Sequence, residues 1–184
     1  MLTRRCAVQA VGAGLLGACA TTAGTPRALA LAPGVFWLPG SDGAADETNL
    51  GRIGNAGFVV GERGVVAIDT GTSLAHGRAL LAAIAATTDK PVRAALVTHT
   101  RPEFLFGGAA FRERGIPIAM HRRCATLMAA RCEGCLKTLR QTVGEAPMAG
   151  TAMYQADQSF DDAHALDVAG RTARVLYFGH SSGP

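Results

Sequence analysis

Apolar residues alternate along the chain between short continuous runs and stripes in which they recur every three or four residues. The short runs predict strands; they cover residues 34–38, 56–60, 65–69, 92–98, 116–120 and 173–178, with weaker stretches near 153–154 and 165–169. The stripes predict helices, and they cover residues 72–86, 107–114 and 121–143. This alternation predicts helices packed on a mixed sheet, an α/β fold.

Several segments carry finer expectations. Residues 56–60 and 65–69 flank a tight turn, which predicts an antiparallel hairpin. The run 92–98 is apolar throughout, which predicts a strand buried on both faces. Pro117 favours a position near the sheet edge for the strand around it, and residues 99–106 are expected to form a loop. The predicted helices cover one face of the sheet, and a second sheet layer would normally need more chain.

Polar residues follow directly on two of the predicted strands. His99 and Glu103 come just after the strand 92–98, and His180 comes just after the strand 173–178. The ends of adjacent strands are where α/β proteins usually place their chemistry. Imidazole and carboxylate are also the non-sulfur ligands that zinc prefers. The two histidines and the carboxylate could therefore converge on one metal ion, or the histidines could be structural residues held by hydrogen bonds.

Three motifs resemble those of a known superfamily, and they occur in its order. Residues 97–104 resemble the H-x-H-x-D-H signature of the metallo-β-lactamase superfamily, which also follows an apolar strand. Residues 68–71 resemble that superfamily's Asp-Thr-Gly turn, and residues 179–183 resemble its later G-H-[ST]-x-G motif. The resemblance spans roughly residues 35–184.

A finer resemblance concerns one branch of that superfamily. Residues 54–60, 88–92 and 148–151 are similar to the quinoprotein relay system zinc metallohydrolases, which are exported proteins associated with periplasmic quinoprotein dehydrogenases. The superfamily resemblance implies an αββα sandwich with two zinc ions at one edge, where a metal-bound hydroxide attacks an ester, amide or thioester. It implies His99, Glu103 and His180 as metal ligands, with Glu103 also as the catalytic residue; because other ligand positions are replaced in this chain, we expect one zinc ion at most.

The chain departs from the superfamily motif at several positions. Arg101 stands where the second histidine is expected, and a guanidinium cannot ligate a metal. Phe104 replaces the last histidine, Glu103 replaces the aspartate, and the superfamily's second structural half is absent. Two functional hypotheses follow: an impaired hydrolase of a small-molecule substrate, or a non-catalytic binding or accessory protein of a periplasmic quinoprotein dehydrogenase system. Arg101 could instead bind an anionic ligand in the same cleft.

The first thirty residues resemble an export signal. Two arginines, Arg4 and Arg5, precede a mild apolar run without acidic residues, as in twin-arginine signals. Residues 28–30 fit an ordinary cleavage site, whereas residues 16–19 resemble a lipobox that would make Cys19 a lipid anchor. We therefore expect a periplasmic or exported protein, with residues 1–30 as the signal and 31–184 as a metallo-β-lactamase-like domain. A chain that is incomplete at its C-terminus, as a piece of a longer gene product, is a further alternative.

Composition narrows these possibilities. The chain has 184 residues, of which 48% are hydrophobic, and this excludes a disordered protein. Its formal charge of +4 includes three arginines of the leader; without them 15 basic and 14 acidic residues remain, which gives no basis for a nucleic-acid partner.

Cys132 and Cys135 form a C-x-x-C pattern, expected to be a structural or oxidised pair, with a redox pair as the alternative. His121 is expected at the surface.

Overall fold

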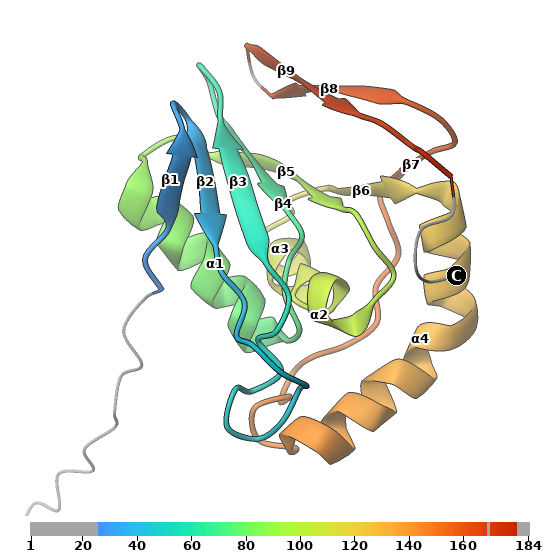
Figure 1. The fold of residues 1–184 in the computed structure, drawn as a ribbon. Coiled ribbons are helices and arrows are strands. Elements are labelled where there is room, and N and C mark those ends of the chain that lie inside the picture. Colours follow the sequence, from blue (N-terminus) through green and yellow to red (C-terminus); the bar gives the residue numbers. More distant parts are fainter. Residues whose placement is uncertain (1–25, 169, 180–184) are drawn as a thin grey trace, which may run out of the picture.

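The computed structural model describes residues 26–168 and 170–179. The strands and helices follow one another in an order close to the predicted one (Figure 1). They are β1 (Leu29–Ala32), β2 (Val35–Leu38), β3 (Ala56–Val60), β4 (Val65–Ile68), α1 (Leu74–Thr87), β5 (Val92–Val97), α2 (Pro102–Leu105), α3 (Gly108–Glu113), β6 (Ile118–His121), α4 (Arg122–Val143), β7 (Gln158–Phe160), β8 (His164–Val168) and β9 (Arg171–Val175).

The first seven strands form one mixed sheet in which spatial order equals chain order, β1-β2-β3-β4-β5-β6-β7. Strands β1 to β4 pair antiparallel, and β4 to β7 pair parallel. The parallel half needs crossover connections, and α1, then α2 with α3, and then α4 supply them. The predicted α/β class, the mixed sheet and the β3–β4 hairpin are confirmed.

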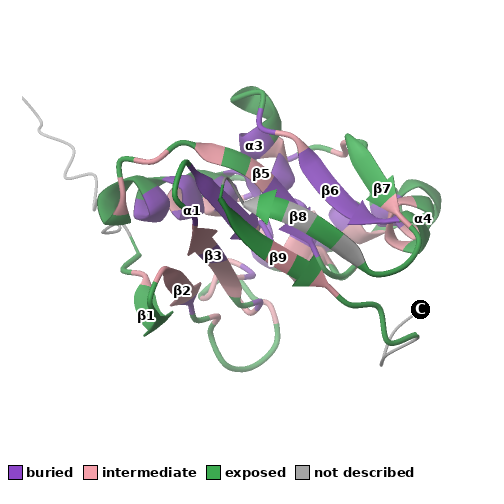
Figure 2. Ribbon diagram, turned by 90° about the horizontal axis from the view of Figure 1, so that it is seen from above, coloured by how far each residue is buried: buried purple, intermediate pink, exposed green. Residues whose placement is uncertain are grey.

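The helices α1, α3 and α4 lie on one face of this sheet, and the β8–β9 hairpin lies over the other (Figures 1 and 2). The main core forms between helices and sheet, with Phe58, Phe106 and Phe111 among its fully buried side chains. On the opposite face, Leu96 and Ala119 are buried against three residues of the later chain: Phe160, Ala173 and Val175. The β8–β9 hairpin therefore forms the start of a second layer, although the sequence predicted that such a layer would need more chain.

Some predicted boundaries were wrong for physical reasons. Residues 102–105 form the short helix α2, because Pro102 occupies its first turn and Glu103 adds a negative charge there. The strand expected near 153–154 is absent, and β7 forms at Gln158–Phe160. The hydroxyl of Tyr154 donates to the Leu105 carbonyl oxygen at 2.8 Å, so this stretch packs through side chains and not through strand pairing.

Two further expectations concern strand position. Pro117 precedes β6, which lies next to the edge strand β7, so the strand is near the sheet edge as expected. In β5 only the last three residues are buried, which corrects the expectation that the whole run is buried on both faces. Strand β1 begins at Leu29, within the segment that the sequence assigns to a leader. In the part of the chain that the structure describes, no helix is both long and apolar enough to cross a membrane.

Candidate functional site

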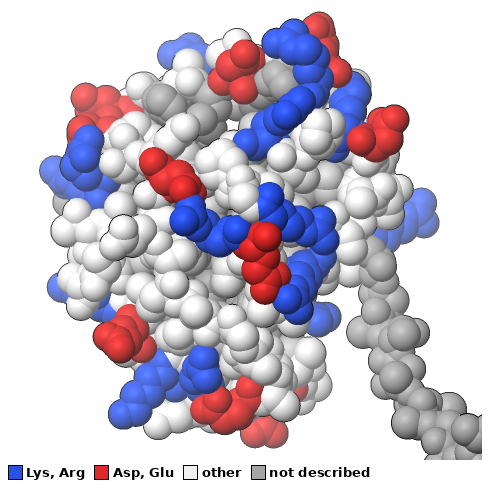
Figure 3. All heavy atoms as spheres, turned by 180° about the vertical axis from the view of Figure 1, so that it is seen from behind, with Lys and Arg blue, Asp and Glu red and all other residues white. Residues whose placement is uncertain are grey.

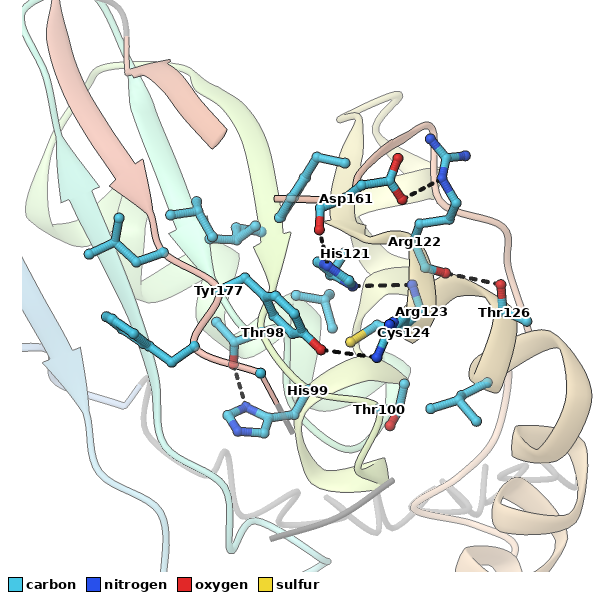
Figure 4. Close-up of a pocket in the computed structure, with 18 of the residues that line it drawn as sticks. Thr98, His99, Thr100, His121, Arg122, Arg123, Cys124, Thr126, Asp161 and Tyr177 are labelled. Carbon is cyan, nitrogen blue, oxygen red and sulfur yellow. Dashed lines mark hydrogen bonds and ion pairs between the residues drawn. The ribbon is translucent and has the colours of Figure 1, made fainter. Parts of the chain in front are cut away.

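A pocket of about 830 Å³ opens where several strands end. The C-terminal ends of β5 and β6, the first turns of α4 and the chain after β9 meet around it (Figure 4). Its lining comprises Leu96, Val97, Thr98, His99, Thr100, Arg101, His121, Arg122, Arg123, Cys124, Thr126, Leu127, Phe160, Asp161, Val175, Leu176, Tyr177, Phe178 and Gly179. The end of β5, after which the sequence predicts the candidate site, thus borders this pocket.

Asp69 connects the ends of β4 and β5 beside this pocket. It is buried, and its backbone is left-handed with φ 57°. One carboxylate oxygen accepts the Thr98 backbone N–H at 2.8 Å, and the Thr98 hydroxyl lies 2.9 and 2.8 Å from the two oxygens. Burial raises the pKa of Asp69 to about 6, although both bonds from Thr98 act in the opposite direction. Asp69 therefore holds the loop that begins at Thr98.

His99 continues this chain of hydrogen bonds. Its Nδ1 lies 2.6 Å from the Thr98 hydroxyl oxygen. That hydroxyl has one proton, and an ionised Asp69 accepts it, so His99 donates from Nδ1 and keeps the Nε2 lone pair. The His99 ring also lies 5.2 Å from the ring of Phe104, measured between centroids. The predicted ligand His99 therefore lies at the pocket with its orientation set by Thr98 and Asp69.

Glu103, the second predicted ligand, is held by its own loop. Its carboxylate pairs with the Nε of Arg101 at 2.8 Å, and its side chain is only 13% exposed. The loop is also tied to β4 through the main chain, because Thr70 N–H donates to the Phe104 carbonyl oxygen at 2.8 Å and the Thr70 hydroxyl donates to that of Leu105 at 2.8 Å. The motif positions are therefore held rigidly, with a cation beside the carboxylate.

The described donor set does not by itself fit zinc. Within residues 26–168 and 170–179, no group of three or more His, Cys, Asp or Glu side chains could hold a metal ion. His180, the third predicted ligand, lies outside the described residues, so the set of His99, Glu103 and His180 stays a prediction. A zinc ion needs about four donors, whereas Arg101 and Phe104 occupy two motif positions with a cation and a hydrocarbon ring.

His121 is buried, which corrects the expectation that it lies at the surface. It is the N-cap of α4, where its Nδ1 accepts the Arg123 backbone N–H at 3.2 Å. Its Nε2 therefore carries the proton and donates to the Asp161 carbonyl oxygen at 2.6 Å. Its ring stacks on Tyr177 with centroids 4.2 Å apart. The sequence placed His121 at the start of a helix, but its role as the N-cap was not recognised, although that position was the available signal.

Charged groups of both signs are paired across the described surface. In the pocket, Nε of Arg122 pairs with Asp161 at 2.7 Å, and a terminal nitrogen of Arg123 donates to the Tyr177 hydroxyl at 3.4 Å. Elsewhere Arg78 pairs with Glu113 at 2.8 Å. Figure 3 shows Lys and Arg interspersed with Asp and Glu on one face, without a large area of a single sign.

The three described cysteines are free, which corrects the expected oxidised pair. Cys132 and Cys135 are both in α4, and each sulfur instead contacts a carbonyl oxygen, of Thr100 at 3.7 Å and of Arg131 at 3.6 Å. Burial, followed by the neighbouring Cys135, raises the pKa of the Cys132 thiol to about 11. A raised pKa disfavours the thiolate that redox chemistry needs. We therefore interpret the Cys132 thiol as a packing group of α4 and not as a redox group.

A second titratable group with a shifted pKa is His76, a half-buried residue of α1. His76 accepts the Thr72 backbone N–H on its Nδ1 at 3.2 Å. Burial, and after it the charge of Arg52, lower the pKa of His76 to about 4. The folded protein therefore binds a proton at Asp69 more tightly, and at His76 less tightly, than the unfolded chain does.

These two groups should give opposite pH dependences to the free energy of unfolding. The Asp69 contribution falls as pH rises from 3.8 to about 6, because the folded state binds more protons there. The His76 contribution rises from about pH 4 to 6.5, because the unfolded state binds more. Asp69→Asn should therefore stabilise increasingly with rising pH in urea unfolding, and His76→Gln should do the reverse. The exposed Asp42→Asn is the control, and equal slopes in all three variants would contradict both assignments.

Comparison with known proteins adds to this geometry. The family model described as the metallo-beta-lactamase superfamily matches residues 50–123. Among curated proteins none matches the chain. The metallo-beta-lactamase from Pontibacter korlensis superposes with a TM-score of 0.62 at 17% identity, covering 82% of this chain and 60% of that one.

Other solved structures agree with that likeness. The FEZ-1 metallo-beta-lactamase from Legionella gormanii has a TM-score of 0.57 at 12% identity, covering 79% of this chain and 50% of that one. The metallo-beta-lactamase from Hirschia baltica has a TM-score of 0.54 at 15% identity, covering 77% and 56%. The chain thus spans 50–60% of the length of these three proteins. These likenesses confirm the predicted αββα-like fold; the finer resemblance to quinoprotein relay proteins stays a prediction.

Proposed function

We propose that this chain, which has a metallo-β-lactamase-like fold, binds a small molecule without zinc-dependent catalysis. Its pocket lies at the strand ends where the fold places its site, and it is large enough for a small ligand. The supporting chemistry is the replacement of ligating side chains at motif positions by Arg101 and Phe104. We therefore propose that the cavity of the fold holds a small-molecule ligand in this protein and not a catalytic zinc ion.

The Arg101–Glu103 ion pair is the observation that carries this proposal. A guanidinium is permanently charged, and here it lies 2.8 Å from the one carboxylate that the motif retains. A zinc ion at Glu103 would have to break that pair and then sit beside a like charge. The carboxylate is better satisfied by Arg101 than by a metal with few other donors.

Metal analysis of the purified chain tests the proposal. After incubation with excess zinc and gel filtration, we expect less than about 0.1 zinc ion per chain, because two imidazoles without a third make a weak site. Elemental mass spectrometry measures the ratio. A stoichiometry near one that survives gel filtration would overturn the proposal.

An impaired hydrolase with one zinc ion is the second candidate. His99 favours it, because Thr98 leaves the Nε2 lone pair of this ring available at the pocket. Its substrate would be an ester, amide or thioester, as the fold family implies. Zinc-dependent turnover of a chromogenic ester that disappears in His99→Ala would support this candidate against the first.

We further propose that the chain is exported to the periplasm and serves as an accessory protein of a quinoprotein dehydrogenase system. The support is the pair Arg4 and Arg5 before a mild apolar run, together with the finer sequence resemblance. In cell fractionation we expect the protein in the periplasm or on its membrane, and Arg4→Lys with Arg5→Lys should retain it in the cytoplasm. Unchanged fractionation of that double variant would contradict twin-arginine export.

A further inference from the structure

The polar rim of the pocket carries more positive than negative charge. Three arginines line it, Arg101, Arg122 and Arg123, whereas Asp161 is the only acidic residue in its lining. Outside the lining, Glu103 pairs with Arg101 and Asp69 is hydrogen-bonded to Thr98, so the surplus of positive charge belongs to the lining itself, with three cations against one carboxylate. The guanidiniums of Arg101 and Arg122 lie on side chains that are 58% exposed, so they remain accessible at the rim.

The start of α4 adds to this positive potential. The helix has 22 residues and no acidic residue in its first turn, where instead Arg122 and Arg123 follow the N-cap His121. A helix N-terminus carries a partial positive charge and favours anions. Placing two arginines there is unfavourable for the isolated helix, and a bound anion would relieve this repulsion.

The inner and distal walls of the pocket are apolar. Leu96, Leu127, Phe160 and Val175 contribute to its lining. The chain after β9 adds three consecutive large side chains that remain open to solvent, Leu176 (48% exposed), Tyr177 (37%) and Phe178 (90%). Consecutive exposed apolar residues at a cavity are typical of a surface that a ligand covers.

We propose that this pocket binds an anionic amphiphile, a carboxylate with an aliphatic or aromatic tail. The carboxylate lies at the arginine rim, and the tail lies along Leu127 and the segment 176–178. Bidentate guanidinium–carboxylate pairing suits the head group, and the apolar lining suits the tail. The inference rests on the proposed metal-free binding function and names its ligand class. The fixed Tyr177–His121 stack, with Arg123 on the Tyr177 hydroxyl, positions the wall next to the rim (Figure 4).

Calorimetric titration with octanoate, in a buffer containing EDTA, tests the proposal on the full chain. Octanol is the neutral probe of equal chain length, and we expect octanoate to bind about tenfold more tightly, which is the usual value of one charge-assisted contact. Arg101→Gln and Arg123→Gln should each weaken octanoate binding about threefold, so that together they account for the tenfold preference, and should leave octanol binding unchanged. Phe178→Ser, at a side chain that is 90% exposed, should weaken both ligands equally. Arg78→Gln, on the α1–α3 surface, is the matched control and should change neither.

Several outcomes would overturn the inference. Equal binding of octanoate and octanol would show that the pocket does not recognise the negative charge. If neither ligand bound, the proposed ligand class would be wrong. Binding only to phosphatidylglycerol vesicles would assign the site to a membrane surface, and sedimentation showing a dimer that excludes octanoate would assign it to a second copy. The titration is done in EDTA, so its result does not depend on bound zinc. A zinc stoichiometry near one in the separate metal analysis would overturn the proposed function, whereas failure of octanoate to bind would overturn only this inference.

Discussion

Arg101→His together with Phe104→His is expected to convert the chain into one that retains about one zinc ion, with affinity raised at least about tenfold. The change places two imidazoles where the superfamily motif has them. The Phe104 ring already lies 5.2 Å from the His99 ring, so an imidazole at residue 104 would lie close to His99. Removing Arg101 also frees the Glu103 carboxylate from its ion pair. Three imidazoles and a carboxylate would then be within one loop.

The matched control is Arg101→Gln with Phe104→Leu, which removes the cation and the ring without adding ligands. Zinc per chain after gel filtration, and competition with a chromogenic chelator, measure the gain, while circular dichroism checks that each variant is folded. Uptake no higher in the histidine variant than in the control would show that the loop is not an inherited metal site.

Gly107→Ala is expected to destabilise the fold by about 3 kcal/mol, near the upper end for overpacking a close backbone contact. A Cβ atom at this position would overlap the Thr70 carbonyl oxygen and lie 2.6 Å from the carbonyl carbon. The neighbouring chain cannot yield easily, because the Gly107 N–H donates to the Gly71 carbonyl oxygen at 2.7 Å. The φ of Gly107 is −63°, so the expected cost is steric and not conformational.

Gly134→Ala supplies the opposite result from the same chemical change. Gly134 lies within α4 with open space around it, so alanine there should stabilise the chain by about 0.5–1 kcal/mol through helix propensity. Urea unfolding followed by circular dichroism measures both variants. Midpoints for Gly107→Ala and wild type that agree within experimental error would show that the contact between Gly107 and Thr70 is looser than the structure indicates.

Local sequence signals predicted most of the elements. The apolar stripe of α4 matches Arg122–Val143 within a residue at its start, and Ser73, a residue type favoured at N-caps, accepts the His76 backbone N–H at the start of α1. These features depend on residues within one or two turns of each other, so the sequence contains the necessary information. Strand β7 was misplaced because its pairing with β6 is a long-range choice that local propensity does not encode.

The candidate site was predictable in position but not in its contacts. The sequence motifs placed His99 and Glu103 directly after β5, where His99 precedes α2 and Glu103 lies within it. They did not indicate that Glu103 pairs with Arg101 or that His121 would be buried. His121 is buried because it contacts Asp161 and Tyr177, which are far along the chain and approach it only after β7 and β9 have formed.

The sequence by itself determined the alternation of strands and helices, the place of the motif loop, and the loss of ligating side chains at Arg101 and Phe104. These follow from residue identity and short-range periodicity. Only the tertiary structure decided that the β8–β9 hairpin covers Leu96 and Ala119, and that arginines and apolar side chains surround one cavity. Burial and electrostatic environment are properties of neighbours in space, and folding brings these neighbours from distant parts of the chain.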